Sequence, residues 1–347
     1  MIIGKYKISK EDKPFIVAEM SGNHNKSLDR AIKIVEAAAE SGAHMLKLQT
    51  YTADTLTINS KNSDFLISDS KSLWKGKTLY DLYKEACTPW EWHEKIFKRC
   101  NELGMLCFST PFDETAVDFL EKLNVPAYKI ASFENIHLPL IKKVAQTGKP
   151  VIISTGLATE TEIEEAVEAL KIGGCKQFCL LKCTSAYPAS PENSNILTIP
   201  DLRKKFNCEV GLSDHTLGIG VALAAISHGA TIIEKHFTLD RNDGGVDSSF
   251  SIEPNDMKIL IKESVRTWQS LGNISYGPTD PEKGGLKLRR SIYIVKNIES
   301  GQKLTKENLR IIRPGKGLAP KYYEELLGRK VNKNLEQGTA LTWNMLE

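Results

Sequence analysis

The sequence predicts a (β/α)8 TIM barrel followed by a small β-rich domain. Short apolar runs of strand length alternate eight times with helical patterns between residues 15 and 271, the size expected of such a barrel. After Gly272 the alternation stops, and the Pro- and Gly-rich stretch SYGPTDPEKGG leads into a different pattern. These two observations predict an α/β fold with two domains.

The expected strands are short and rich in Val, Ile and Leu, as buried parallel strands are. In order they are 15–20, 45–50, 105–110, 127–132, 151–156, 178–185, 208–214 and 231–239. The helices expected to follow them are 28–41, 90–103, 113–123, 138–147, 159–171, 217–230 and 254–271. Gly42 ends the first helix, and ATETEIEE resembles a capping box at the start of 159–171. Residues 51–90 are polar and are expected to form an extended loop over the site.

The predicted domains are a catalytic barrel (1–274), a linker (275–285) and a C-terminal domain (286–347). The last segment is too short for further βα units. It contains strand-like runs, SIYIVKNI and ALTWNML, and one short helix near 321–327. A domain of this size is only marginally stable alone, so we expect it to pack on the barrel or on a partner chain.

Composition excludes several classes of function. With 46 basic and 43 acidic residues the net charge is +3, without a basic block, so nucleic-acid and membrane-surface binding are not expected. No apolar run has the length of a membrane span, and the N-terminus lacks the apolar core of a signal peptide. The seven cysteines include no C-x-x-C pair, which predicts reduced thiols in a cytoplasmic enzyme.

Two histidines stand at matching positions, His215 after one expected strand and His236 near the end of the next. In a parallel barrel the carboxyl ends of all strands meet at one face, where active sites lie. For an isolated histidine, the ordinary interpretation is a hydrogen-bonded structural residue. Two at matched strand ends, with Asp214 and Asp247 nearby, favour a metal site.

Lysines and hydroxyl groups also gather at the expected strand ends. A lysine inside a barrel is costly unless it meets an anion. One interpretation pairs Lys47, Lys129 and Lys182 with Glu19, Glu134 and Glu234. The other, which the nearby serines favour, is that the lysines converge on a phosphate or phospho-carboxylate ligand.

Nine motifs, in order along the chain, resemble those of the sialic acid synthase family: AEMSGNHN, KLQTY, CFSTPFD, KIASFE, ISTGLA, CTSAYP, GLSDHTLG, IEKHFTLDR and GGVDSSFS. IRPGKGLAP resembles the C-terminal antifreeze-like (SAF) domain of that family. Within the family, residues 18–25, 88–93 and 180–188 are most similar to the pseudaminic acid synthases. Ser185 stands where N-acetylneuraminate synthases usually have Asn, which weakens any transfer of their specificity.

This resemblance implies a transferase that forms a carbon–carbon bond between phosphoenolpyruvate and the open aldehyde form of an acylated amino sugar. The product is a nine-carbon 2-keto acid, and phosphate leaves by C–O cleavage. A divalent metal held by His215 and His236 takes part, with Mn²⁺ expected first and Mg²⁺ or Co²⁺ as alternatives. By resemblance, phosphoenolpyruvate is held by Lys47, Lys129, Ser132, Ser154, Ser185 and Ser213.

Other roles follow from the same resemblance. Glu19, and after it Glu134, is the candidate to activate water or stabilise the oxocarbenium ion. Tyr187 and Asp247 are expected to contact the sugar, and Arg313 to reach it from the neighbouring subunit of a domain-swapped homodimer.

The expected sugar is 2,4-diacetamido-2,4,6-trideoxy-altrose, which gives pseudaminic acid, with Trp90, Trp92 or Phe112 near its apolar groups. The alternative is an N-acetylneuraminate or legionaminate synthase that uses a mannose-type sugar.

Two hypotheses from other functional classes also fit parts of the sequence. A metal-dependent aldolase or sugar isomerase on the same barrel would use the histidines and carboxylates but would need no phosphate-binding residues. A sugar-binding or regulatory module based on the C-terminal domain would show no turnover. Release of phosphate from phosphoenolpyruvate distinguishes a synthase from both.

Overall fold

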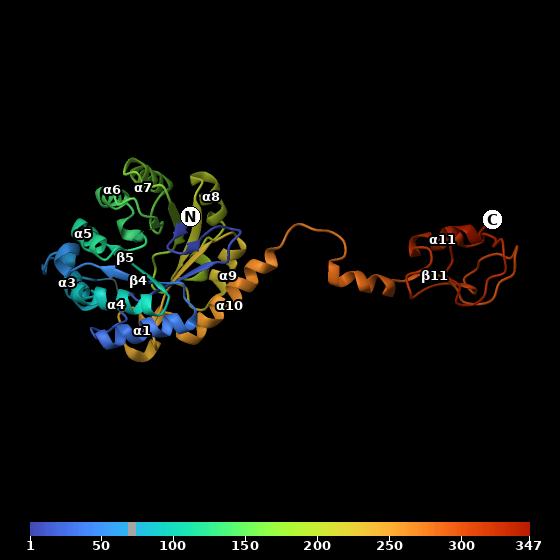
Figure 1. The fold of residues 1–347 in the computed structure, drawn as a ribbon, viewed down its shortest axis with the longest axis horizontal. Coiled ribbons are helices and arrows are strands. Elements are labelled where there is room, and N and C mark those ends of the chain that lie inside the picture. The colour runs from blue at the N-terminus through green and yellow to red at the C-terminus, as the bar shows by residue number, and fades with distance from the viewer. Residues whose placement is uncertain (69–73) are drawn as a thin grey trace. The chain divides into compact units, whose positions relative to one another are not determined.

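The computed structural model of the chain describes residues 1–68 and 74–347. The chain divides into two compact units, Met1–Gly272 and Asn273–Glu347. The first unit is a closed barrel of eight parallel strands in the order β10-β3-β4-β5-β6-β7-β8-β9 (Figure 1). The predicted (β/α)8 fold is therefore confirmed.

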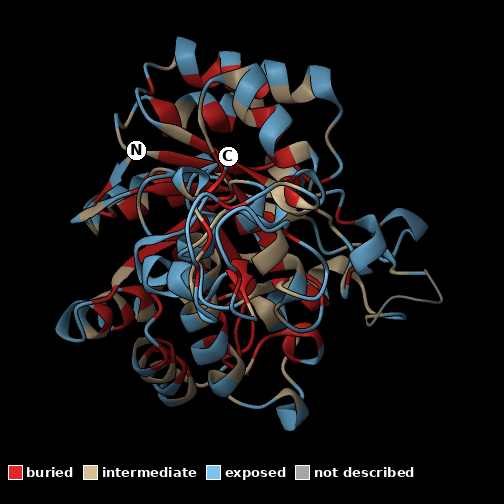
Figure 2. Ribbon diagram, turned by 90° about the vertical axis from the view of Figure 1, so that its right-hand side faces the viewer, coloured by how far each residue is buried: buried red, intermediate tan, exposed pale blue. Residues whose placement is uncertain are grey.

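The barrel strands lie close to the predicted positions. They are β3 (Phe15–Glu19), β4 (Met45–Thr50), β5 (Leu106–Pro111), β6 (Tyr128–Ile130), β7 (Val151–Ser154), β8 (Phe178–Cys183), β9 (Glu209–Asp214) and β10 (Ile232–His236). Side chains alternate between two apolar layers, so that Val17 packs inside the barrel while Ile16 faces the helices. The strands are almost wholly buried, whereas the helices expose one side to solvent (Figure 2). Pairing of β10 with β3 closes the barrel and sets His236 beside Glu19.

Helices follow or separate the strands around the barrel. They are α1 (Leu28–Ser41), α4 (Trp90–Glu102), α5 (Glu114–Lys122), α6 (Leu138–Ala145), α7 (Glu160–Ile172), α8 (Thr198–Phe206), α9 (Gly220–Ser227) and α10 (Pro254–Leu271). Gly42 ends α1 with φ 89°, and Thr159 and Glu162 form the predicted capping box of α7. The sequence analysis did not identify α8, because this short helix contains Pro200 and carries few apolar residues. None of the helices in the described ranges is long and apolar enough to cross a membrane.

Residues 51–68 and 74–90 contain helical segments where an extended loop was expected. They include α2 (Ala53–Leu56), a 3-10 turn η1 (Ser63–Phe65) and α3 (Leu79–Ala86). Thr52 and Thr78 cap the two helices through their hydroxyl groups. Threonine is a common residue at the start of a helix, but its presence alone does not predict one. Residues 69–73 of the expected loop lie outside the described residues.

The second unit is built around an antiparallel pair, β11 (Ser291–Ile294) and β12 (Leu309–Ile312). The short helix predicted near 321–327 is present as α11 (Tyr323–Leu326). ALTWNML was expected to form a strand, but Trp343–Met345 forms a 3-10 turn instead. A 3-10 helix, η6 (Asp280–Leu288), covers the second half of the predicted linker, so that half is not extended.

Candidate active site

Two lysines and two glutamates form a buried ionic cluster, the lysine–glutamate cluster (Glu19, Lys47, Lys129 and Glu234), within the barrel. The Lys47 Nζ lies 3.0 Å from Glu19 Oε2 and 3.4 Å from Glu234 Oε1. The Lys129 Nζ lies 3.7 Å from Glu234 Oε1. Four different strands contribute these residues, so the cluster exists only in the closed barrel. The pairing of lysines with Glu19 and Glu234 is present as one interpretation predicted, but Glu134 forms no such pair among the described residues.

Burial and neighbouring charges shift the pKa values of the cluster's residues in different directions. Burial alone would raise the pKa of Glu234, but Lys129 and Lys47 lower it to about 2. Burial opposes the charge on Lys47, yet Glu19 and Glu234 raise its pKa above the ordinary value. For Lys129 burial prevails over Glu234, so its pKa is lowered. Glu234, the carboxylate partner of Lys129, only partly neutralises this lysine. An anion bound near Lys129 would therefore be stabilised by the charge that remains.

A group of hydroxyls, the serine cluster (Ser132, Ser154 and Ser185), lies next to the lysines. The Lys129 Nζ donates to Ser154 Oγ at 2.6 Å, and the Gly156 amide donates to Ser132 Oγ at 3.1 Å. A Cβ added to Gly156 would overlap the hydroxyls of Ser185 and Ser132. Glycine thus leaves room where backbone and hydroxyl donors converge, an arrangement suited to an anion.

The two histidines predicted as metal ligands lie together at the carboxyl ends of β9 and β10. Their ring centroids are 5.2 Å apart. The His215 Nδ1 lies 2.9 Å from the Thr184 carbonyl, so it carries the proton, and in the neutral imidazole Nε2 keeps the lone pair. The buried Nδ1 of His236 has no hydrogen-bond partner among the described residues and lies 3.5 Å from Asp247 Oδ2.

These donors fit a divalent metal, but they form an incomplete ligand set. Within residues 1–68 and 74–347, no group of three or more His, Cys, Asp or Glu side chains is arranged to hold a metal ion. A fixed imidazole tautomer and an unpartnered buried nitrogen suit an ion that takes its other ligands from substrate and water.

A chain of hydrogen bonds connects Glu19 to Asp247. The Gln49 amide donates to Glu19 Oε1 at 2.9 Å and to Ser21 Oγ at 3.0 Å, and Ser21 donates to Asp247. Burial raises the pKa of Asp247, but the contact with His236 prevails and lowers it below its usual value. Ser21 and Gln49 were not among the predicted site residues. Their bridging position appears only when β3, β4 and the loop after β10 are brought together.

A pocket of about 420 Å³, the mouth pocket, opens at the carboxyl ends of the strands. Ser21, Gln49, Glu134 and Asp247 line it with polar groups, Tyr51, Tyr83 and Tyr187 each carry a hydroxyl, and most of the other lining side chains are apolar. The ring of Tyr187 lies 4.5 Å from that of His215. Burial raises the pKa of Glu134 to about 7, against the opposing effects of Lys129 and Lys47. Within the part of the chain that the structure describes, the buried Oε2 of Glu134 has no hydrogen-bond partner.

One expectation about an individual residue, Lys182, is wrong, and the expectation of a nearby aromatic residue holds for Phe112 alone. Lys182 does not converge with Lys47 and Lys129, because β8 turns Cys179, Leu181 and Cys183 inward and so directs Lys182 to the outer face, where it donates to the Cys183 carbonyl at 2.8 Å. Trp90 and Trp92 do not line the mouth pocket. They pack beside Phe119 and His24 respectively, and of the three expected aromatic residues only Phe112 lines the pocket.

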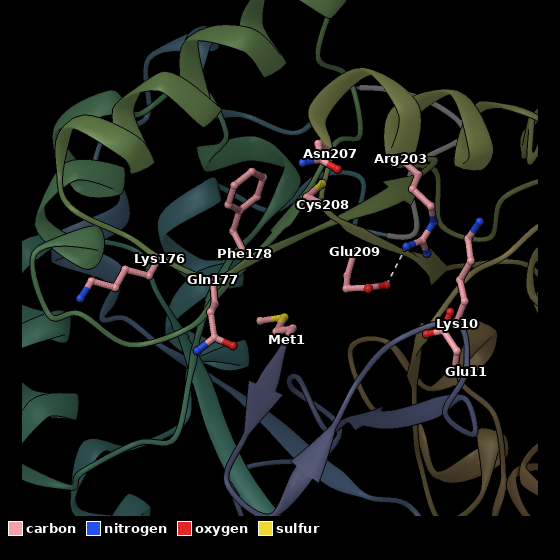
Figure 3. Close-up of a pocket in the computed structure, with 10 residues that line it drawn as sticks. All are labelled: Met1, Lys10, Glu11, Lys176, Gln177, Phe178, Arg203, Asn207, Cys208 and Glu209. Atoms are coloured by element: carbon pink, nitrogen blue, oxygen red, sulfur yellow. Dashed lines mark hydrogen bonds and ion pairs between the residues drawn. The ribbon is translucent and has the colours of Figure 1, made fainter.

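A second pocket, of about 470 Å³, lies at the opposite, amino-terminal end of the barrel (Figure 3). Figure 3 shows Met1 from the N-terminal hairpin (β1, Ile2–Ile3, and β2, Tyr6–Lys7) near Phe178 and Glu209, the first residues of β8 and β9. Arg203 is paired with Glu209 at 2.7 Å across this pocket. None of the predicted site residues lies there, and this end of a barrel generally serves stability.

The sequence of the chain matches known proteins along its whole length. The profile of the NeuB family matches residues 34–276, and that of the SAF domain matches residues 289–347. The chain belongs to the NeuB family. This confirms the resemblance to sialic acid synthases and the SAF assignment.

Two curated members of the NeuB family and one solved structure show how close the relationship is. The pseudaminic acid synthase of Campylobacter jejuni is 43% identical over 98% of each chain. The N,N'-diacetyllegionaminic acid synthase of Legionella pneumophila is 38% identical over 96% of this chain and 94% of its own. The crystal structure of N-acetylneuraminic acid synthetase from Leptospira borgpetersenii has a TM-score of 0.73 and 31% identity, over 82% of this chain and 94% of its own.

Arg313 is the one predicted site residue that belongs to the second unit, where it is exposed and directly follows β12. The barrel brings the other twelve residues to its carboxyl end: Glu19, Lys47, Lys129, Ser132, Glu134, Ser154, Ser185, Tyr187, Ser213, His215, His236 and Asp247. Cys183, expected only to be a reduced thiol, lies within the candidate site, where its sulfur is 3.9 Å from both His215 Nδ1 and Ser185 Oγ.

Proposed function

We propose that this NeuB-family protein is a pseudaminic acid synthase, which condenses phosphoenolpyruvate with 2,4-diacetamido-2,4,6-trideoxy-altrose. The observation that carries the proposal is the 43% identity to a curated pseudaminic acid synthase over 98% of both chains. The barrel supports it, because buried lysines, serines and two histidines lie at one end of it.

The proposed binding of phosphoenolpyruvate uses the lysine–glutamate and serine clusters. Lys47 and Lys129 balance the charge of the phosphate and carboxylate, and Ser132, Ser154, Ser185 and Ser213 donate hydrogen bonds to their oxygens. Ser213 already donates to Glu234 Oε1 at 3.2 Å, so its hydroxyl is directed toward the same group of ions. Glu234 keeps both lysines in place before the ligand arrives.

The proposed reaction begins when C3 of phosphoenolpyruvate attacks the sugar aldehyde, which leaves a cation at C2. Glu19, held by Lys47 and Gln49, is placed to stabilise this cation. Glu134 takes a proton from the water that adds to C2, since a group with a pKa of about 7 exchanges protons readily near neutral pH. The tetrahedral intermediate then expels phosphate by C–O cleavage, and its C2 hydroxyl loses a proton as the keto group forms. The two protons of the added water end on the former aldehyde oxygen and on the phosphate. Asp247 and Tyr187 contact the sugar hydroxyls and acylamino groups.

The proposed metal is Mn²⁺, with Mg²⁺ or Co²⁺ as alternatives, and it would be held by His215 and His236. When bound it would act as a Lewis acid on the aldehyde and orient both substrates. Asp247 Oδ2 lies 3.5 Å from the Nδ1 of His236, so this carboxylate would be next to the ion.

The proposed working unit is a domain-swapped homodimer in which Arg313 completes the sugar site of the neighbouring barrel. Among the described residues that line the mouth pocket none is basic, whereas Glu134 and Asp247 are acidic. An arginine supplied by another subunit would offset these carboxyl groups and donate to the acylamino carbonyls of the sugar.

Phosphate release tests the proposal. The protein is incubated with phosphoenolpyruvate, Mn²⁺ and one of three sugars: the diacetamido-trideoxy-altrose, N-acetylmannosamine or the 2,4-diacetamido-2,4,6-trideoxy-mannose that would give legionaminic acid. We expect the altrose to give the highest kcat/KM and a product of the mass of pseudaminic acid. Faster release with either mannose-type sugar would assign the enzyme to the N-acetylneuraminate or legionaminate synthases instead.

A further inference from the structure

We propose that helices α2 and α3 form an apolar wall that selects the end of the sugar remote from its aldehyde. The ligand class that this wall fits is a deoxy, acylamino sugar whose remote end carries methyl groups instead of a free hydroxyl or a phosphate. The inference rests on the proposed function and names the residues that determine specificity within it.

The apolar wall is defined by Leu56 of α2, Ile67, and Leu79, Leu82 and Tyr83 of α3, all of which line the mouth pocket. Positions 79, 82 and 83 are separated by three and four residues, so they lie on one face of α3. Phe112, after β5, also lines the pocket. Apart from the phenolic hydroxyl of Tyr83, these side chains offer no hydrogen bond to a sugar.

The wall is fixed to the barrel and is therefore able to discriminate. The Tyr80 hydroxyl donates to Asp54 Oδ1 at 3.1 Å, which joins α3 to α2. The ring of Tyr83 packs edge-on against that of Tyr51, with centroids 5.9 Å apart, just after β4. The indole of Trp74 donates to the Val246 carbonyl at 3.3 Å, beside Asp247. The apolar face is thus held against the same loop that carries a proposed sugar-binding carboxylate.

The chemistry of this wall favours methyl groups. A hydroxyl moved from water to a leucine-rich surface loses its hydrogen bonds, whereas a methyl group there leaves water favourably. One methylene in an apolar pocket changes kcat/KM by roughly 10- to 200-fold. A phosphate would in addition face the carboxyl groups of Glu134 and Asp247. One arginine contributed by a partner subunit would offset only one of these two carboxyl groups.

The test compares two sugars that differ at one position, 2,4-diacetamido-2,4,6-trideoxy-altrose and its 6-hydroxy counterpart, with phosphate release as the readout. For the unmodified protein we expect kcat/KM to be at least roughly tenfold higher with the deoxy sugar. In Leu79→Asn that preference should fall roughly tenfold or more, while the KM for phosphoenolpyruvate stays unchanged. N-acetylmannosamine 6-phosphate should be the poorest substrate of the series.

Two further variants make the result specific to the wall. Leu56→Asn places the same change on α2 and should also reduce the preference, so the test does not depend on one variant folding. Lys84→Ala alters an exposed residue of α3 that does not line the pocket, and its preference should equal that of the unmodified protein.

Several outcomes would overturn the inference. The first is an equal kcat/KM for the deoxy and hydroxy sugars in the unmodified protein, and the second is a preference for the phosphorylated sugar. The third is that the Leu79 and Leu56 variants lose kcat/KM to the same extent with both sugars. Turnover of another nonulosonate precursor without this preference would reject the wall and leave the synthase reaction standing. Absence of phosphate release with every sugar would contradict the synthase function and the wall together.

Discussion

His236 lies in direct contact with a second histidine ring and a buried carboxylate, so its removal tests the proposed metal site. We expect His236→Ala to lower the rate of phosphate release by at least about 100-fold, since even residues that only support a ligand cost 10- to 100-fold. Binding of Mn²⁺, measured by electron paramagnetic resonance without substrates, should weaken in parallel. His228→Ala, an exposed histidine after α9, is the matched control. Undiminished Mn²⁺ binding by His236→Ala would reject the assignment.

Glu134 links burial to the pH dependence of stability. Burial raises its pKa to about 7 from 4.5, so the folded protein holds this proton more tightly than the unfolded chain does. The stabilising contribution is fully present below about pH 4.5 and is lost as the pH rises through about 7. The loss is at most about 3 kcal/mol.

Glu134→Gln has no charge to gain, and its melting temperature relative to the unmodified protein should therefore rise between pH 5 and pH 8. We expect a relative change of roughly 5 °C, measured by differential scanning calorimetry. Glu165→Gln, at an exposed position on α7, should show no such trend. Parallel melting curves for Glu134→Gln and the unmodified protein across this pH range would contradict the burial effect.

At the scale of an element, the turn after β7 shows how a backbone position shapes the site. A Cβ at Gly156 would lie 2.6 Å from Ser132 Oγ and would overlap Ser185 Oγ. We expect Gly156→Ala to displace these hydroxyls and raise the KM for phosphoenolpyruvate about tenfold, because one or two charge-assisted hydrogen bonds weaken. The KM for the sugar should change much less.

Gly220→Ala provides the comparison for that variant. Gly220 begins α9, and a Cβ there meets nothing within 4 Å. Its KM values for phosphoenolpyruvate and for the sugar, measured by steady-state kinetics with each substrate varied in turn, should be close to those of the unmodified protein. If Gly156→Ala keeps the original KM for phosphoenolpyruvate, the serine cluster does not bind that substrate.

At the scale of the whole molecule, mixing of subunits tests the proposed role of Arg313. If Arg313 completes the site of a partner barrel, the inactive variants Arg313→Ala and His236→Ala should complement each other when their subunits are mixed. In the heterodimer, the barrel that keeps His236 receives Arg313 from the other chain, so one site of two becomes whole. About half of the activity per heterodimer should return.

Differently tagged variants allow heterodimers to be purified, which shows subunit exchange independently of activity. Arg310→Ala changes an exposed arginine of β12 and should remain active by itself. Heterodimers without any activity would mean that Arg313 serves its own barrel, and the swapped arrangement would be rejected.

The sequence alone was enough to predict the barrel and the strand ends at which the candidate site residues lie. Regular spacing of eight apolar runs placed every barrel strand within a few residues, because buried parallel strands must be apolar and short. His215, His236, Lys47 and Lys129 could be recognised as neighbours, because parallel strands bring their carboxyl ends to one face.

Tertiary structure decided what periodicity could not. Side-chain direction in a strand depends on register, and β8 turned Cys183 inward and Lys182 outward. Residues 51–90 carry no strong helical pattern, yet capping by Thr52 and Thr78 and packing over the barrel produce α2 and α3. The apolar wall could not be predicted from this segment, because its composition is mainly polar and its few leucines come together only after folding. Contacts between distant residues depend on closure of the barrel, and local sequence does not encode them by itself.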